Sequence, residues 1–339
     1  MSAEASANPL PQLLRQALWP LALLYGAVGA VRNALFAMGW KRVRRLDCVV
    51  VSVGNLTVGG TGKTPAVAWL CQLAKDAGRT PGVLARGYGR PPGAPLNDEG
   101  LLLQRRLPWL LQEQDPDRVA AGGRLVERGA DFIVLDDGFQ HRRLHRDLDV
   151  VCLDARMPFG NGHCLPTGDL RELRGGIRRA DLVLLTRADG LDREQLARRV
   201  ARIREISGQP QLAIYACAHA PTSCIEQPSG ETLPLEELRG RRVVLLSAIA
   251  KPASFRETAE RLGLEVVGEF VHRDHHRFSH QEVEAAAAAA RDAGGLLLTT
   301  EKDDARLDGF ALSRHVLRVE LRFVDAPPTP EELLLGASK

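Results

Sequence analysis

The sequence predicts an α/β protein in which a mostly parallel sheet is flanked by helices. Several short runs are apolar on both faces, as strands buried inside a parallel sheet are. These runs alternate with helical segments, which is the order produced by crossover connections. One run is followed by a glycine-rich turn and then a helix, the local order of a phosphate-binding loop. Together these patterns favour an α/β fold built around that loop.

The N-terminal segment, residues 1–45, predicts a helix that docks on a membrane. Residues 16–31 carry no charge, but Pro20 and Arg32 interrupt the apolar run, which is shorter than the roughly 20 residues that span a bilayer. We therefore expect a helix lying in the interface. A signal peptide is disfavoured because the run begins late and lacks a clean cleavage site, while a helix packed on the protein remains the alternative. The flanking aromatic and basic residues are Trp19, Tyr25, Trp40, Lys41, Arg42, Arg44 and Arg45.

Residues 49–65 combine a strand-like run of valines with a glycine-rich turn. The turn can place backbone N–H groups around phosphate oxygens, Lys63 adds a cation toward the terminal phosphates, and the Thr64 hydroxyl can bind Mg²⁺. Thr57 stands where the standard motif has glycine, so the loop is a variant. A turn without a ligand is the alternative, which the order of strand, loop and helix disfavours. The residues expected to bind the nucleotide are Thr57, Val58, Gly59, Gly60, Thr61, Gly62, Lys63 and Thr64.

The rest of the chain divides into a core, residues 46–235, and a smaller α/β unit, residues 236–339. A polar stretch at 220–230 suggests the connection between them. Six consecutive alanines in the smaller unit predict a helix that serves as scaffold. The expected strands are 80–85, 130–137, 148–154, 180–186, 241–247, 264–267 and 295–300, and the expected helices include 193–206, one ending near 262, and 281–291.

Composition limits the classes of function. The chain has 339 residues, of which 45% are hydrophobic, so a large core is expected. A net charge of +3 is too small to indicate nucleic acid, and the sequence has neither a helix-turn-helix pattern nor an RNA-binding signature. The six cysteines include no CxxC pair, which favours reduced thiols in the cytosol over disulfides or a zinc knuckle.

Asp136 and Asp137 end the strand that we expect beside the phosphate-loop strand. The carboxyl ends of parallel strands face the ligand crevice, where kinases place the carboxylates that hold Mg²⁺. The alternative is that they are turn residues before Gly138. The phosphate loop upstream favours a metal site made by Thr64, Asp136 and Asp137.

Motifs spread along the chain resemble those of the tetraacyldisaccharide 4′-kinases of lipid A biosynthesis. They occur in the same order as in that family and cover nearly the whole sequence. The matching segments are 54–65, Arg86-Gly87-Tyr88-Gly89, Asp136-Asp137-Gly138-Phe139-Gln140-His141, Phe159-Gly160-Asn161-Gly162, Leu170-Arg171-Glu172, Asp274-His275-His276-Arg277-Phe278 and Thr300-Glu301-Lys302-Asp303.

This resemblance implies a P-loop kinase that transfers the γ-phosphate of ATP, with Mg²⁺, to the 4′-hydroxyl of an acylated, 1-phosphorylated glucosamine disaccharide. The product is the bisphosphorylated lipid A precursor, lipid IVA. The resemblance places this reaction at the cytoplasmic face of the bacterial inner membrane, and the N-terminal segment would then serve to dock the enzyme on that surface. No nucleic-acid partner is expected.

The resemblance also implies the site residues. Asp98 corresponds to the aspartate that accepts the hydroxyl proton, and His275 is the histidine expected to orient it. Arg171, Glu172 and His141 are implied as substrate contacts, with an ordinary surface ion pair as the alternative for Arg171 and Glu172. The sequence departs from the family pattern at Asn97, Gly100 and Asp169. A solvated loop carboxylate is therefore the alternative for Asp98.

The histidines near the C-terminus raise the question of a metal site. His272, His275, His276 and His280 lie close together in the sequence, but no Cys or Glu stands at an evident ligand spacing. A surface cluster is thus as well supported as a zinc site.

Two other functional classes fit the phosphate loop. A variant-P-loop regulatory ATPase that acts as a membrane-associated switch shares the Gly-Gly-x-Gly-Lys-Thr pattern, but it has lysine where this chain has Val58. A membrane adaptor whose attachment is regulated by nucleotide is the third class. Lipid-stimulated ATP turnover with a phosphorylated lipid product would exclude the adaptor.

Overall fold

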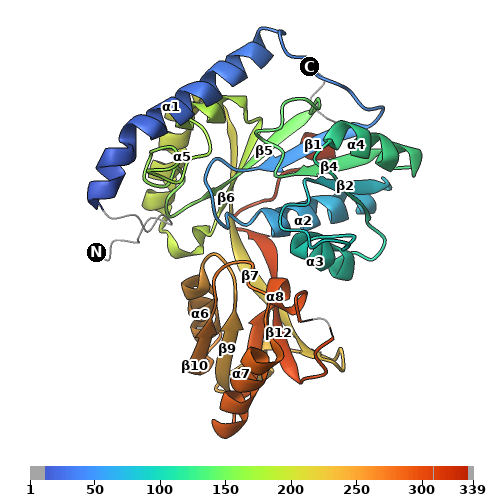
Figure 1. Cartoon of the computed structure of the whole chain (residues 1–339), viewed down its shortest axis with the longest axis vertical. Coiled ribbons are helices and arrows are strands. Elements are labelled where there is room, and N and C mark those ends of the chain that lie inside the picture. Colours follow the sequence, from blue (N-terminus) through green and yellow to red (C-terminus); the bar gives the residue numbers. More distant parts are fainter. Residues whose placement is uncertain (1–11, 308, 335–339) are drawn as a thin grey trace. The chain divides into compact units, whose positions relative to one another are not determined.

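A computed structural model describes residues 12–307 and 309–334, which form two compact units (Figure 1). The first unit comprises Met1–Gly87, Trp109–His219 and Leu321–Lys339, and the second comprises Tyr88–Pro108 and Ala220–Glu320. The division differs from the expected one at residue 236, because the second unit takes in an early segment that carries Asp98. The chain crosses between the units after Gly87, after Pro108, and within two long strands, β7 (Ala213–Gln227) and β12 (Arg314–Phe323).

The first unit contains a parallel sheet in the order β7-β6-β5-β1-β4-β2-β3. The expected neighbour relation is confirmed, since β1 pairs with β4 from Val49 opposite Phe132 to Val53 opposite Asp136. Asp136 therefore ends its strand beside the start of the glycine-rich loop. The other strands of this unit are β1 (Val49–Gly54), β2 (Pro81–Ala85), β3 (Leu111–Gln114), β4 (Phe132–Asp136), β5 (Leu148–Asp154) and β6 (Leu182–Thr186).

Helices of the first unit cover this sheet. Val50 and Ile133 lie opposite each other, and they pack with Leu125 of α4 in one hydrophobic cluster. Val151 and Leu185 pack with Ile203 of α5 in another. The long helix α1 carries the N-terminal segment. The helical elements are α1 (Gln12–Ala37), α2 (Lys63–Asp76), α4 (Arg118–Glu127), η1 (Arg174–Arg179), η2 (Ala188–Gly190), α5 (Arg193–Ser207) and α9 (Pro330–Leu334).

The second unit contains strands in the order β10-β9-β11-β12-β7, with β8 antiparallel on β7. Val243 packs with α6 and Val244 with α7, so these helices cover opposite faces of β9. The alanine run lies on α7 with Ala286 buried, in agreement with the predicted scaffold helix. The remaining elements are β8 (Thr232–Leu233), β9 (Arg242–Ser247), β10 (Glu265–Val271), β11 (Leu296–Thr300), α3 (Asp98–Arg106), η3 (Leu235–Leu238), α6 (Pro252–Arg261), α7 (His280–Asp292) and α8 (Glu301–Asp304).

The expectation of a polar connection over 220–230 is wrong for most of this stretch, because residues 220–227 are the second half of β7. Within residues 220–227 only Cys224 is fully buried, Thr222 is exposed, and the other side chains are partly buried. A half-exposed strand of this kind lacks the continuous apolar run of a central strand.

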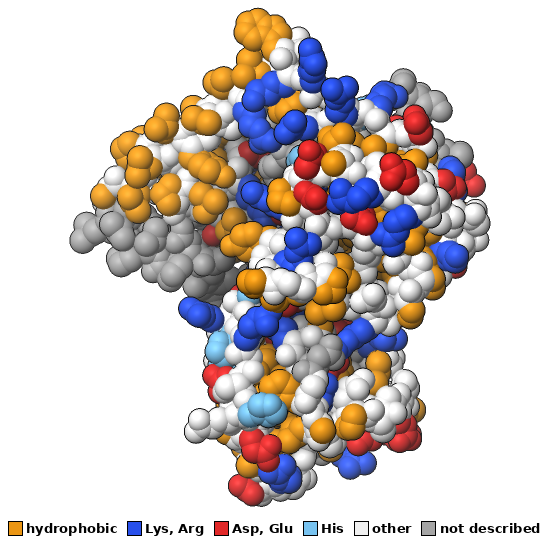
Figure 2. All heavy atoms as spheres, turned by 45° about the vertical axis from the view of Figure 1, so that its right-hand side comes forward, with side chains coloured by type: hydrophobic (Ala, Val, Ile, Leu, Met, Phe, Trp, Pro, Cys, Tyr) orange, Lys and Arg blue, Asp and Glu red, His pale blue; other side chains and the backbone are white. Residues whose placement is uncertain are grey.

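The expected N-terminal helix is present, and α1 continues through Pro20 and Arg32 to Ala37. Within it, residues Gln16–Ala37 are long and apolar enough to cross a membrane by length and composition. Ala22 and Phe36 are buried, whereas Leu24 is 61% exposed and Val28 is 60% exposed. Figure 2 shows hydrophobic side chains gathered over this helix, with Lys and Arg side chains beside them.

Candidate functional site

The glycine-rich loop ends at a helix N-terminus that suits an anion. Helix α2 begins at Lys63, preceded by Gly62 in the left-handed conformation, with φ of 80°, and among the described residues no side chain caps it. The first backbone N–H groups of α2 are therefore available to bind a phosphate. A Cβ at Gly62 would lie 2.1 Å from Nε2 of His219, so only glycine fits beneath that imidazole. Burial lowers the pKa of His219 to about 4, which keeps the ring neutral.

The variant position Thr57 has a structural explanation. The backbone on either side of it pairs with a neighbouring segment, as Val58 N donates to Asp169 O at 2.7 Å and Arg171 N donates to Leu56 O at 2.8 Å. Asn55 Nδ2 then donates to Thr57 O at 2.7 Å. The loop is thus extended and paired here, so the positive φ that a glycine supplies is not needed.

Lys63 and Arg171 converge on Asp137. Lys63 Nζ lies 3.3 Å from Asp137 Oδ1, and Arg171 reaches the two carboxylate oxygens at 2.7 and 2.6 Å. Burial acts to raise the pKa of Asp137, but Lys63 and Arg171 outweigh it and lower this pKa to about 2. The carboxylate is therefore charged at neutral pH and holds both cations beside the start of α2.

The start of α4 adds a third cation that the sequence did not reveal. Arg118 is buried, and burial lowers its pKa although Asp137 and Asp136 act to raise it. One region of the first unit thus contains three cations, two carboxylates and a hydroxyl, which belong to Lys63, Arg171, Arg118, Asp136, Asp137 and Thr64. Carboxylate and hydroxyl oxygens are the ligands that Mg²⁺ prefers, and the cations and helix N-terminus suit a polyphosphate. These residues fit Mg²⁺ and ATP.

Glu172 does not pair with Arg171 but lies buried among other partners. Its oxygens accept hydrogen bonds from Asn33 Nδ2 at 2.8 Å, Gln140 Nε2 at 2.9 Å and Arg179 at 2.8 Å. Gln140 Nε2 also donates to Asn55 O at 2.9 Å. Glu172 thereby connects α1 with the segment that leads into the glycine-rich loop.

His141 follows Gln140 and is also enclosed. Burial lowers its pKa to about 4, and the nearby positive charge of Arg118 and Arg146 acts in the same direction. The imidazole is therefore neutral at physiological pH. As a substrate contact it would act as a hydrogen-bonding group without a charge.

Asp98 lies in the second unit as the first residue of α3. The departures from the family motif form the N-cap of this helix, since Asn97 Oδ1 accepts from Gly100 N at 3.0 Å. Asp98 is only 9% exposed, so the alternative of a solvated loop carboxylate is wrong.

The structure places His275, rather than His276, against Asp98. His275 Nδ1 lies 3.2 Å from Asp98 Oδ2, and Arg306 Nε donates to the same oxygen at 2.7 Å. Burial acts to raise the pKa of Asp98, but the hydrogen bonds and charge of His275 and Arg306 lower it to about 2. His275 has a φ of 63°, an uncommon left-handed conformation for a residue other than glycine.

Arg306 was missed by the sequence analysis. It is held in place by Asp303 Oδ1 at 2.9 Å and by Ala248 O at 2.8 Å. The available signal was its position three residues after Asp303, the last residue of a segment already identified as a motif. Residues three positions apart in a helical turn lie on the same side of the turn, so Asp303 and Arg306 are neighbours.

The expectation that the C-terminal histidines lack an acidic partner is wrong. His272 and His276 both approach Glu282, which follows them on α7. His280 instead packs on the ring of Phe310, with ring centroids 4.4 Å apart.

Known proteins resemble this chain over nearly its whole length. The model of the family described as LpxK, tetraacyldisaccharide-1-P 4′-kinase, matches residues 14–338. A tetraacyldisaccharide 4′-kinase of Anaeromyxobacter sp. (strain K) is 43% identical over 330 residues, covering 92% of this chain and 85% of that protein. One from Syntrophus aciditrophicus is 38% identical, covering 93% and 91%.

A solved structure agrees with these relatives. The crystal structure of LpxK from Aquifex aeolicus, described as an "apo" form in complex with ATP, has a TM-score of 0.72 and 29% identity, with 91% of this chain and 95% of that chain covered. The fold, the motifs and the extent of these matches lead to one conclusion: the chain belongs to the tetraacyldisaccharide-1-P 4′-kinase family.

Proposed function

We propose that the protein transfers the γ-phosphoryl group of ATP to the 4′-hydroxyl of a tetraacyldisaccharide 1-phosphate, forming lipid IVA. The observation that carries this proposal is the contact of buried Asp98 with His275, which accompanies a complete phosphate-binding loop. A regulatory ATPase needs the loop alone. A kinase also needs a group that takes the proton of the acceptor hydroxyl.

On the nucleotide side, the roles follow from charge and position. Lys63 and the first N–H groups of α2 bind the terminal phosphates, and Arg171 and Arg118 offset the charge that spreads over the transferred group. Thr64, Asp136 and Asp137 would hold Mg²⁺. When bound, this ion neutralises phosphate charge and draws the phosphate oxygens into position.

On the acceptor side, Asp98 orients the hydroxyl and receives its proton. A carboxylate with a pKa of about 2 is a weak base. Phosphoryl transfer passes through a loose transition state in which the hydroxyl keeps its proton until late, so a weak, well-placed base is sufficient. His275 fixes the direction of the carboxylate and shares the proton. The proton and ADP are then released along with the phosphorylated lipid.

The lipid substrate accounts for the exposed apolar surface of α1. A substrate with four acyl chains stays in the bilayer, so the enzyme has to reach it there. Exposed Trp19, Leu24 and Val28 are suited to the acyl boundary, and the basic residues after Trp40 are suited to anionic headgroups. We infer attachment to the cytoplasmic face of the inner membrane, where ATP is available.

The direct test is to incubate the purified full chain with Mg-ATP and the 1-phosphorylated tetraacyl disaccharide in detergent micelles. We expect a bisphosphorylated lipid and one ADP for each product molecule. A matched acceptor without its 4′-hydroxyl should give no product. ATP hydrolysis that yields no phosphorylated lipid would instead support the switch ATPase.

Replacing apolar residues of α1 by charged ones should weaken membrane attachment. The double variant Leu24→Glu, Val28→Glu places charge where two apolar side chains would enter the membrane interface. Each substitution should reduce the favourable free energy of membrane binding by about 1.5–3 kcal/mol. We expect at least about a tenfold lower partition onto vesicles containing anionic phospholipid, measured by co-sedimentation. Val324→Glu is the matched control, because Val324 is 51% exposed but lies outside α1. Equal partition of all three proteins would place the docking surface elsewhere.

A further inference from the structure

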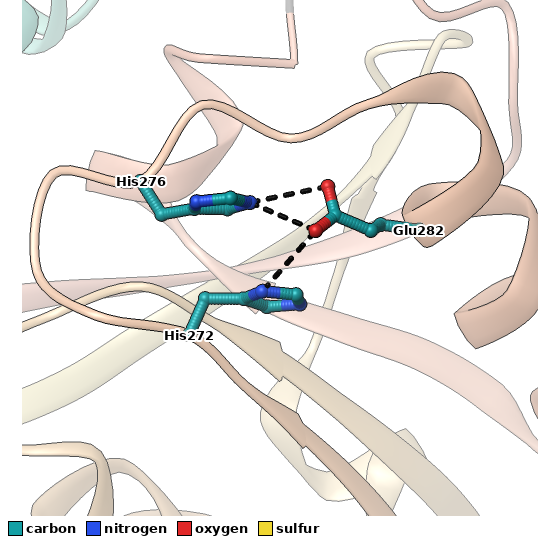
Figure 3. A group of neighbouring side chains, drawn as sticks. All are labelled: His272, His276 and Glu282. Atoms are coloured by element: carbon teal, nitrogen blue, oxygen red, sulfur yellow. Dashed lines mark hydrogen bonds and ion pairs between the residues drawn. The ribbon is translucent and has the colours of Figure 1, made fainter.

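Three metal-ligating side chains meet in the second unit, outside the residues assigned to ATP and Asp98. Figure 3 shows His272 and His276 directing ring nitrogens toward the carboxylate of Glu282. His276 Nε2 lies 3.0 Å from Glu282 Oε1 and 3.1 Å from Oε2, and His272 Nδ1 lies 3.5 Å from Oε1. All three ligand atoms lie within 4.8 Å of one another.

The two nitrogen–oxygen separations match those between neighbouring ligands of one metal ion. Zinc bonds of about 2.0–2.2 Å to nitrogen and oxygen place neighbouring tetrahedral ligands about 3.3 Å apart. The two distances from Oε1, 3.0 and 3.5 Å, bracket that value. A metal ion could thus bind with small rotations of side chains that already converge.

The neighbouring residues hold the ligands in this arrangement. The buried ring of Phe278 meets both imidazoles edge-on, at centroid distances of 5.4 Å for His272 and 5.7 Å for His276. Ser279 N and Oγ donate to Glu282 Oε2 at 2.7 and 2.8 Å in a capping box. These are the outer-shell contacts that orient a carboxylate ligand.

The stacking of the two histidines favours a metal over a simple ion pair. Their rings are nearly parallel, at 7°, with centroids 4.6 Å apart. Parallel rings at this spacing direct two ring nitrogens toward the same carboxylate, so one ion can contact all three side chains. A divalent ion satisfies both neutral imidazoles and the carboxylate at once.

We propose that His272 Nδ1, His276 Nε2 and Glu282 form a binding site for a divalent transition-metal ion, with Zn²⁺ as the best match. Two imidazole nitrogens suit Zn²⁺ and disfavour Mg²⁺, which prefers oxygen ligands, so this site is chemically distinct from that expected for the nucleotide's ion. The ion would tie the 272–276 loop to α7. His275 lies in that loop, and the metal would therefore help to hold it in its left-handed conformation.

The test measures metal binding by the full chain without ATP or lipid, so it is independent of the kinase proposal. Chelator-treated protein is titrated with Zn²⁺ and followed by calorimetry and thermal unfolding. We expect one high-affinity ion per chain and a higher Tm when it binds. Glu282→Gln keeps a side chain that can complete the capping box but removes the carboxylate ligand. This variant and His276→Ala should each weaken binding at least about tenfold and remove most of the Tm increase.

Glu284→Gln, on the same helix but paired with Arg291 at the surface, and His280→Ala are the matched controls and should bind as the unchanged protein does. Co²⁺ substitution should give the visible absorption of a four-coordinate site without thiolate bands. Zinc binding that is absent, or that is equal in all variants, would overturn the proposal and leave a histidine–glutamate ion pair.

Discussion

Lys63→Ala should reduce ATP affinity at least about tenfold and phosphoryl transfer about a hundredfold to a thousandfold, the usual loss when one preorganised donor to a transferring group is removed. Lys63 is the first residue of α2, where it adds a mobile positive charge to a helix N-terminus that already favours anions. Alanine keeps the helix but removes that charge. The effect should appear both in nucleotide binding, measured by calorimetry, and in lipid phosphorylation.

The fold should survive this substitution. Asp137 loses one ion pair but keeps the two contacts from Arg171, so the carboxylate is not left buried alone. Lys75→Ala, in the last turn of the same helix, is the matched control, since Lys75 lies over the ring of Trp109. Unchanged ATP affinity in Lys63→Ala, with the control also unchanged, would contradict the assignment of the phosphate-binding loop.

The central strands of both units could be predicted because burial on both faces leaves a continuous apolar run. The strands β5 and β6 were identified in this way, and β5 with its bounds. By contrast, β3 and β12 have mixed exposure, and the apolar run that marks a central strand is absent from them. Helix propensity and the alanine run were enough for α7.

The arrangement around Asp98 could be predicted only in part. The family motifs indicated Asp98 and His275, but a contact between residues that are 177 positions apart leaves no local pattern. Arg306 lies 208 positions from Asp98, and its spacing from Asp303 indicates a helical neighbour but not a contact with Asp98. The choice between His275 and His276 depends on the backbone of one loop, where a φ of 63° turns His275 toward Asp98 and leaves His276 beside Glu282.

The N-terminal helix shows how a local rule can be overridden. Proline inside a helix costs about 3 kcal/mol because it removes one hydrogen bond and crowds the preceding turn. In α1, the 26-residue helix extends on both sides of Pro20 and is anchored by buried Phe36 and by the hydrogen bond from Asn33 to Glu172. These contacts occur far from the proline, and the apolar run by itself does not reveal them.

Asp98→Asn should lower phosphoryl transfer about a hundredfold to ten-thousandfold, the range for loss of a general base, while ATP affinity changes less than about twofold. Asparagine keeps the size of the side chain but cannot accept the hydroxyl proton. The residue lies in the second unit, and so do its hydrogen-bond partners His275 and Arg306. Single-turnover kinetics with bound ATP would measure the loss.

The same substitution has a stability cost that must be separated from the catalytic one. The pKa of Asp98 is lowered from 3.8 to about 2, so its charged form stabilises the fold above about pH 4, and this contribution is lost as the pH falls through about 2. It amounts to the order of 2 kcal/mol at neutral pH. Urea unfolding at pH 7 would reveal this loss, and Arg306 would keep Asp303 as a partner.

Glu99→Gln is the matched control for Asp98→Asn, because it neutralises the adjacent carboxylate, whose partner is Lys302 at 3.0 Å. We expect this control to retain most of the transfer rate. If Asp98→Asn instead turned over at a near-normal rate while still folded at the assay temperature, Asp98 could not be the base. The low pKa of Asp98 sharpens this test: transfer that depends on its ionised form should stay constant from neutral pH down to the acid range where the fold itself begins to fail.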